Sequence, residues 1–312
     1  MIRLLRRIAG GESLRHRPVA LRPAEQQPVR AFVRSTAGQR DVTAQLFPIS
    51  LSPLLLGLAR STEAPPAGAV DIGFRDAVSG EWLGLLELVP AGQIMLDGRT
   101  LDLLHPTASR VSCASPATLL WRYGLAWRQN QLNARRPHSF RMSLPDLKAL
   151  NLFYMMPRPV HLVSVLHKRA GNIFPMDLVG PLGDDLFLLA LRLTSPSIEP
   201  ICAGGRIVVS GAPVAMKESA YQLGLHHKTP MVDWDGLPIP VAPSPLFGIP
   251  APVAALGLRE LEVRHFQPVG SHMLFATSVA GFSHRREEAQ FCHVSDMYAR
   301  WRIAQGRPFA DA

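Results

Sequence analysis

The chain has 312 residues, of which 47% are hydrophobic and 18% charged, so it can bury a sizeable core and is not intrinsically disordered. Its 28 prolines and 24 glycines exclude a helical bundle or a coiled coil, because both residues interrupt long helices. The three cysteines lie far apart without CxxC spacing, which argues against a disulfide framework and against a zinc cluster.

The net charge of +9 is concentrated at the start of the chain. Residues 1–40 hold nine arginines and two glutamates, a net of +7, which leaves +2 for the remaining 272 residues. A nucleic-acid-binding protein presents a basic stripe on a folded surface, so this distribution predicts no nucleic-acid partner. We interpret residues 1–24 as a basic N-terminal arm. Four lysines against 29 arginines indicate a GC-rich bacterial genome.

No segment is suited to cross a membrane as a helix. The longest uncharged run, 236–258, contains six prolines and is expected to be a long, extended loop. The first residues are basic but lack the apolar stretch of a secretory signal. We therefore expect a cytoplasmic protein.

Strand patterns dominate the first third of the chain. Alternating or apolar runs predict strands over 29–34, 54–59, 70–75, 82–89 and 93–96. Proline and glycine predict a break at 90–92 and a turn at Asp97-Gly98.

Two helices are expected in the middle of the chain. Ser115 and Ser143 are typical N-caps ahead of helical patterns, which predicts helices over 115–133 and 143–153 with a linker at 133–137. Strands then return, and a closing helix is expected last. The predicted strands are 159–166, 185–193, 206–210, 260–266 and 273–280, with a turn at Gly270-Ser271 and the helix at 294–305.

The two halves repeat one pattern of strand, turn and strand. Residues 28–42 match 159–173 at an offset of 131, and one inserted residue later 54–62 align with 186–194. Either an internal duplication or a chance likeness of two small β units accounts for this.

Standard catalytic motifs are missing from the sequence, among them GxSxG, the P-loop, GxGxxG and HExxH. His226-His227, His284 and His293 have no carboxylate at ligand spacing. We interpret them as surface or turn histidines and expect no metal site.

One turn has the chemistry of a phosphate site. Arg192 is followed by three hydroxyl residues, Thr194, Ser195 and Ser197. Hydroxyl and backbone N–H groups donate hydrogen bonds to phosphate, and a guanidinium supplies charge. The segment 171–177 ahead of it is read as irregular, with backbone donors for a planar ring. Turns of this composition also follow many strands without binding a ligand.

These segments resemble the flavin reductase-like family with its FMN-binding split barrel. The resemblance lies in MPRPVHLVSV, the turn ending in Gly-Asn and the R-x-T-S-x-S turn, and in 261–280 (LEVRHFQPVGSHMLFATSVA) and 41–59 (DVTAQLFPISLSPLLLGLA). It implies a mainly β fold built on a six-stranded antiparallel Greek-key barrel, with two related barrels in tandem and connecting helices. The implied domains are an N-terminal barrel at 25–140, with either a working or a degenerate site, and an FMN-binding domain at 141–312.

The resemblance also implies site residues. His272 would face the flavin where nicotinamide docks, although a plain hairpin-turn histidine explains it nearly as well. Lys217 would be a second phosphate contact. The residues that would line the isoalloxazine ring are Asn172, Ile173, Phe174, Pro175, Met176 and Asp177, and those that would hold the phosphate are Arg192, Thr194, Ser195 and Ser197. The sequence departs from the family's pattern at Ser271, where an Asp is usual, and at 171–177, which reads GNIFPMD.

The implied function is that of an FMN-binding oxidoreductase of flavin reductase type. NAD(P)H would pass a hydride to the flavin, which would serve a downstream acceptor such as a monooxygenase. The family builds its sites at a dimer interface, so a homodimer or an internal pseudo-dimer is expected. The alternative is a non-catalytic flavin-binding or protein-interaction module.

Overall fold

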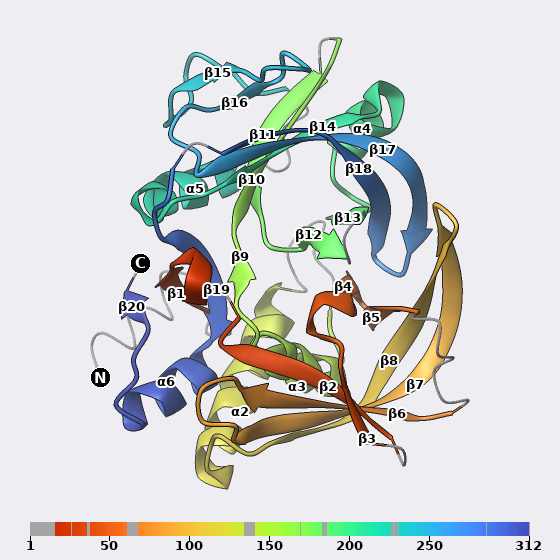
Figure 1. The fold of residues 1–312 in the computed structure, drawn as a ribbon, viewed down its shortest axis with the longest axis vertical. Helices are drawn as coiled ribbons and strands as arrows, with labels where there is room; N and C mark the ends of the chain where they lie inside the picture. The colour runs from red at the N-terminus through yellow and green to blue at the C-terminus, as the bar shows by residue number, and fades with distance from the viewer. Residues whose placement is uncertain are drawn as a thin grey trace.

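The fold is that of a computed structural model (Figure 1). The described residues are 16–25, 27–35, 38–60, 68–133, 141–168, 170–182, 186–225, 229, 231–284 and 286–311. The first 15 residues of the expected arm, the linker residues 134–137 and His226-His227 lie outside them.

The first half of the chain forms a seven-stranded antiparallel sheet in the order β3-β2-β6-β7-β8-β5-β4. A hairpin lies at each edge, β2–β3 at one and β4–β5 at the other, with three strands between them. The strands are β2 Val29–Ser35, β3 Gly38–Asp41, β4 Leu46–Leu51, β5 Leu54–Ala59, β6 Val70–Asp76, β7 Trp82–Leu96 and β8 Arg99–Val111.

The second half forms another seven-stranded sheet with the same strand order, β11-β10-β14-β17-β18-β13-β12. Its edge hairpins are β10–β11 and β12–β13. The strands are β10 His161–His167, β11 Ala170–Met176, β12 Val179–Leu182, β13 Leu186–Arg192, β14 Arg206–Gly211, β17 Gly257–Val269 and β18 His272–His284.

The chain is thus mainly β, but its sheets differ from the expected closed six-stranded barrels. Each sheet has seven strands, and among the described residues no ladder joins β3 to β4 or β11 to β12, so both sheets are open. Each half has a core of its own, with residues such as Ile72 and Leu86 in the first and Val209 and Phe275 in the second.

Smaller elements complete the molecule. A four-stranded sheet has the order β20-β1-β19-β9, and β15 pairs with β16 inside the segment 236–258, which was expected to be a loop. The strands are β1 His16–Leu21, β9 Arg158–Pro159, β15 Val241–Pro243, β16 Pro250–Pro252, β19 Gln290–Ser295 and β20 Ala310–Asp311. The helices are η1 Pro23–Glu25, α2 Pro116–Asn133, η2 Thr43–Gln45, α3 Leu144–Phe153, α4 Ile198–Gly204, η3 Val214–Met216, α5 Lys217–Leu223 and α6 Asp296–Ala304. None of the described helices is long and apolar enough to cross a bilayer.

Local signals predicted both middle helices correctly. The Ser143 hydroxyl accepts a hydrogen bond from the backbone N–H of Asp146 at 3.1 Å, which caps α3, and Ser115 accepts one from Thr118 at 3.3 Å ahead of α2. The expected break at 90–92 is wrong. β7 continues through it with a bulge between Pro90 and Gly92, which absorbs the proline without ending the ladder.

The two sheets meet along a seam of apolar side chains in the middle of the molecule. Strand β4 of the first sheet packs against β13 and β18 of the second. One buried cluster contains strand residues of both sheets, with Phe47 and Ile49 from the first and Leu186, Leu188 and Leu274 from the second. Apolar burial therefore holds the halves together.

Elements from the end of the chain pack on the first sheet. The hydroxyl of Tyr298 in α6 donates a hydrogen bond to Asp76 at the end of β6, at 2.7 Å. β1, which lies within the segment expected to be an arm, pairs with β19 through Leu21, and its last three residues are buried. The boundary at residue 140 stays a prediction.

Candidate functional site

Strand pairing brings the expected phosphate turn next to the expected nicotinamide-facing histidine. Arg192, the last residue of β13, lies directly opposite His272, the first residue of β18. The next backbone N–H, that of Leu193, donates to the carbonyl of Ser271 at 3.1 Å. Two residues that the sequence separates by 80 positions thus share one end of the second sheet.

The hydroxyl turn is folded back on itself. The N–H of Ser195 donates to the carbonyl of Arg192 at 2.8 Å, and the N–H of Ser197 donates to the hydroxyl of Ser195 at 3.3 Å. Arg192 and Thr194 are exposed, Ser195 is partly exposed and Ser197 is buried. Three of the four expected phosphate residues are therefore open to a ligand from solvent.

His272 is buried and neutral. Burial, together with the positive charge of Arg192, lowers the pKa of His272 to about 4. Its Nδ1 lies 2.9 Å from the hydroxyl of Ser271. At neutral pH this imidazole can donate or accept a hydrogen bond, but it adds no positive charge beside Arg192.

The turn that carries His272 is bound to the other half of the molecule. The hydroxyl of Ser271 accepts a hydrogen bond from the N–H of Ser52 at 3.0 Å, and the N–H of Ser271 donates to the hydroxyl of Ser50 at 3.1 Å. Gly270 has a φ of +56°, and a Cβ there would collide with the Ser50 hydroxyl. The candidate site therefore lies at the seam, and glycine permits the close approach.

Residues 172–177, expected to line the flavin, are not an irregular segment. Residues 170–176 pair one by one with β10, so this part of the chain is a strand. Asn172 donates from its side-chain amide to the carbonyl of Thr229 at 2.7 Å. Alternation along the strand sends Ile173 and Phe174 into two separate apolar cores. Pro175 and Met176 are partly buried. A role for these residues in flavin binding stays a prediction.

Lys217 begins α5, which packs against β11. Its ammonium lies 3.6 Å from the carboxylate of Glu218. Its role as a second phosphate contact also stays a prediction.

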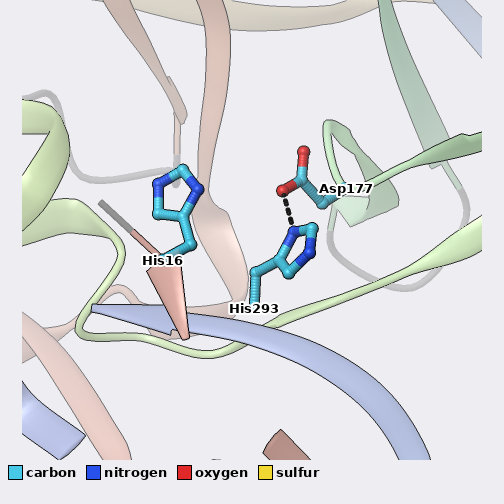
Figure 2. Close-up of side chains that lie close together, drawn as sticks. All are labelled: His16, Asp177 and His293. Carbon is cyan, nitrogen blue, oxygen red and sulfur yellow. Dashed lines mark hydrogen bonds and ion pairs between the residues drawn. The ribbon is translucent and has the colours of Figure 1, made fainter. Parts of the chain in front are cut away.

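Asp177, just after β11, belongs to a polar cluster that sequence reasoning missed. Its Oδ2 lies 2.8 Å from Nδ1 of His293, and His16 lies beside them (Figure 2). Burial would raise the pKa of Asp177, but the hydrogen bond to His293 and the charges of His293, His16 and Arg158 lower it. His293 lies within β19 and is not the surface or turn residue expected from the sequence, whereas His284 is exposed at the end of β18.

A second buried histidine, His161, makes stability sensitive to acid. Burial and the charges of Arg259 and Arg158 lower the pKa of His161 to about 3. The folded protein therefore keeps His161 and His272 neutral at pH values where the unfolded chain, with an ordinary histidine pKa of about 6.5, binds protons. The free energy of unfolding is expected to fall by about 1.4 kcal/mol per pH unit for each of these histidines as the pH drops below about 6.5.

Urea unfolding at about pH 7 and pH 5 tests this expectation. His161→Gln should lose about 2 kcal/mol less stability than the parent protein between these two conditions, since it removes one of the two buried neutral histidines. The same substitution at the exposed His265 is the control. An equal loss in the parent protein and in His161→Gln would show that His161 does not stay neutral in the fold.

Several solved structures are similar to part of the chain. An FMN-binding protein from Thermus thermophilus with bound p-hydroxybenzaldehyde is 21% identical, with 41% of this chain and 73% of that chain covered and a TM-score of 0.36. The NADH:FAD oxidoreductase of Streptomyces globisporus is 16% identical, with 47% and 88% covered and a TM-score of 0.43. A flavin reductase in its native state, PheA2, is 16% identical, with 46% and 90% covered and a TM-score of 0.38. No protein-family model and no curated protein matches the chain. The similar solved structures are thus FMN-binding proteins and flavin reductases.

Proposed function

We propose that the chain is an FMN-binding oxidoreductase of flavin reductase type, with its flavin at the seam between the two sheets. The observation that carries the proposal is the pairing of Arg192 with His272 at the end of β13 and β18. It joins the two parts of the site that the family resemblance implies, an anion-binding turn and a neutral histidine. No carboxylate pair or nucleophilic triad is needed, because the hydride chemistry belongs to the cofactor.

The chain's own residues would bind and orient the cofactor. Arg192 would pair with the phosphate through its guanidinium, and the hydroxyls of Thr194 and Ser195 would donate further hydrogen bonds. His272 would supply an uncharged hydrogen-bonding edge beside the ring. FMN held by these residues would supply the hydride-transfer chemistry between NAD(P)H and an acceptor, for which we propose a monooxygenase partner.

We further infer that the two sheets arose by duplication and form an internal pseudo-dimer, with domains at 25–140 and 141–312. A cytoplasmic location is also our proposal. Both sheets have the same strand order, and β5 and β13 begin at an offset of 132 residues. The fold therefore supports two related units in tandem. Seven strands in one order favour duplication over the alternative of a chance likeness.

The duplicated unit explains why the first half would be degenerate. By the same offset, Arg60 is the counterpart of Arg192, and its guanidinium is engaged by Asp102 at 2.6 Å and 3.3 Å. In the first sheet, Asp102 lies opposite Leu58 of β5. The counterpart of Leu58 in the second sheet is Ala190, and the residue opposite Ala190 on β18 is Leu274. In the first half, a carboxylate therefore competes with phosphate for the arginine. We expect one FMN per chain.

Titration with FMN, followed by flavin absorbance and fluorescence, tests the proposal. Saturable uptake of one FMN per chain and oxidation of NADH or NADPH by the loaded protein are the expected results. Uptake without nicotinamide oxidation would favour the flavin-binding module instead. Failure to take up FMN or FAD would overturn both readings of the site.

A further inference from the structure

Two histidines are brought together by the ladder between β1 and β19. His16 lies opposite Ser295, and Pro18 lies opposite His293, so the two histidines are diagonal neighbours on one face of the ladder. Their rings are stacked with centroids 5.8 Å apart. Since β1 comes from the start of the chain and β19 from its end, only the fold makes this pair.

A carboxylate completes the cluster from a third element. Asp177 follows β11 and points toward both rings (Figure 2). One potential ligand atom from each of His16, Asp177 and His293 lies within 4.8 Å of the other two. Within the described part of the chain, no other three His, Cys, Asp or Glu side chains come together in this way.

We propose that His16, Asp177 and His293 form a binding site for a divalent transition-metal ion of the Zn²⁺ class. Two imidazole nitrogens and one carboxylate oxygen are a common donor set for such ions, with further positions left to water. Ligand bonds of about 2.0–2.2 Å place tetrahedral donors roughly 3.3 Å apart. His293 and Asp177, now 2.8 Å apart, would separate by roughly half an ångström, and His16 would move inward.

The surroundings hold the donors in place. The hydroxyl of Tyr154 donates to Oδ2 of Asp177 at 3.0 Å, and its ring stacks on His16 with centroids 3.7 Å apart. On the far side of His293, Nε2 lies 3.5 Å from the hydroxyl of Tyr221, which leaves Nδ1 directed at the carboxylate. A metal-bound histidine characteristically donates a hydrogen bond from its second ring nitrogen to such an outer partner.

Local charge decides which metals fit. The guanidinium of Arg158 donates to the backbone carbonyl of Asp177 at 3.2 Å and contributes a positive charge close to the single carboxylate. Ca²⁺ and Mg²⁺ prefer several oxygen ligands, usually carboxylates, and are disfavoured here. Transition-metal ions that bind neutral imidazole are favoured.

A bound metal ion would link β1 and β19 to the end of β11.

The test is a titration of the full chain, freed of metal with a chelator, with Zn²⁺ by calorimetry and with Co²⁺ by visible absorption. We expect one ion per chain and a higher midpoint of thermal unfolding with Zn²⁺, since the ion binds the folded form. His16→Ala is expected to weaken Zn²⁺ binding by at least about 100-fold, and Tyr221→Phe by about 10-fold, as for loss of an outer partner.

The control variant is His265→Ala, which removes an exposed histidine from another part of the surface. It should bind Zn²⁺ as the parent protein does. His16 is substituted rather than Asp177 because Asp177 also belongs to the segment proposed to contact flavin. A loss of metal binding in His16→Ala therefore cannot be confused with an effect on FMN binding. Absence of stoichiometric uptake, or equal affinity in His16→Ala and the parent, would overturn the proposal and leave a hydrogen-bonded His–Asp pair with a stacked ring.

Discussion

Replacing Arg192 with alanine is expected to weaken FMN binding by about 1.5–3 kcal/mol, a loss of roughly 10- to 150-fold in affinity. Arg192 is the exposed last residue of β13, directly before the hydroxyl turn and opposite His272 in the ladder. In the proposed complex it supplies a charge-assisted hydrogen bond to the phosphate, and the remaining hydroxyls cannot replace that charge. The dissociation constant from a fluorescence titration measures the effect.

The chain supplies a matched control in Arg60, the counterpart of Arg192 in the first sheet. Its guanidinium is already paired with Asp102, so Arg60→Ala should leave the FMN dissociation constant unchanged. Riboflavin, which lacks the phosphate, should bind the parent protein and Arg192→Ala with similar affinity. If Arg192→Ala binds FMN as tightly as the parent, the phosphate does not lie at this turn.

The largest expected change in stability is at Asp76, where Asp76→Ala should lower the free energy of unfolding by about 3–5 kcal/mol. The Asp76 side chain is fully buried and lies 3.1 Å from Arg307. It also accepts hydrogen bonds from Tyr298 and Ser79. Burial raises the pKa of Asp76, but those hydrogen bonds and the charge of Arg307 together bring it below its usual value, so the carboxylate is ionised. Its removal takes the carboxylate away from the Arg307 guanidinium and leaves the buried Tyr298 hydroxyl to the Pro28 carbonyl, 3.2 Å away.

Urea unfolding of the full chain measures this change, with the slope of the transition checked for two-state behaviour. Asp311→Ala is the control, because the Asp311 carboxylate is 81% exposed and pairs with Arg17 at the surface at 2.7 Å. It should cost no more than about 1 kcal/mol. Equal effects of the two substitutions would mean that the contact between α6 and the first sheet contributes little to folding.

Elements with strong local signals were predictable. Serine caps and apolar periodicity located α2 and α3, and Asp97-Gly98 marked the turn between β7 and β8. β8 itself was missed, since its sequence RTLDLLHPTASRV has no clean alternation and becomes a strand only between β7 and β5. β11 was read as irregular because Pro175 suggested a break. The proline is tolerated because β11 is the last strand of its sheet.

The sequence by itself determined the β-rich class, the capped helices, the similar strand patterns of the two halves and the residue types of the Arg192 turn, because each depends on neighbours close along the chain. Tertiary structure alone decided the rest. It set Arg192 opposite His272, joined Ser271 to Ser50 across the seam, and brought His16 and His293 from the two ends of the chain to Asp177. Ladder register and apolar burial fix these distant pairings, and no spacing in the sequence encodes them.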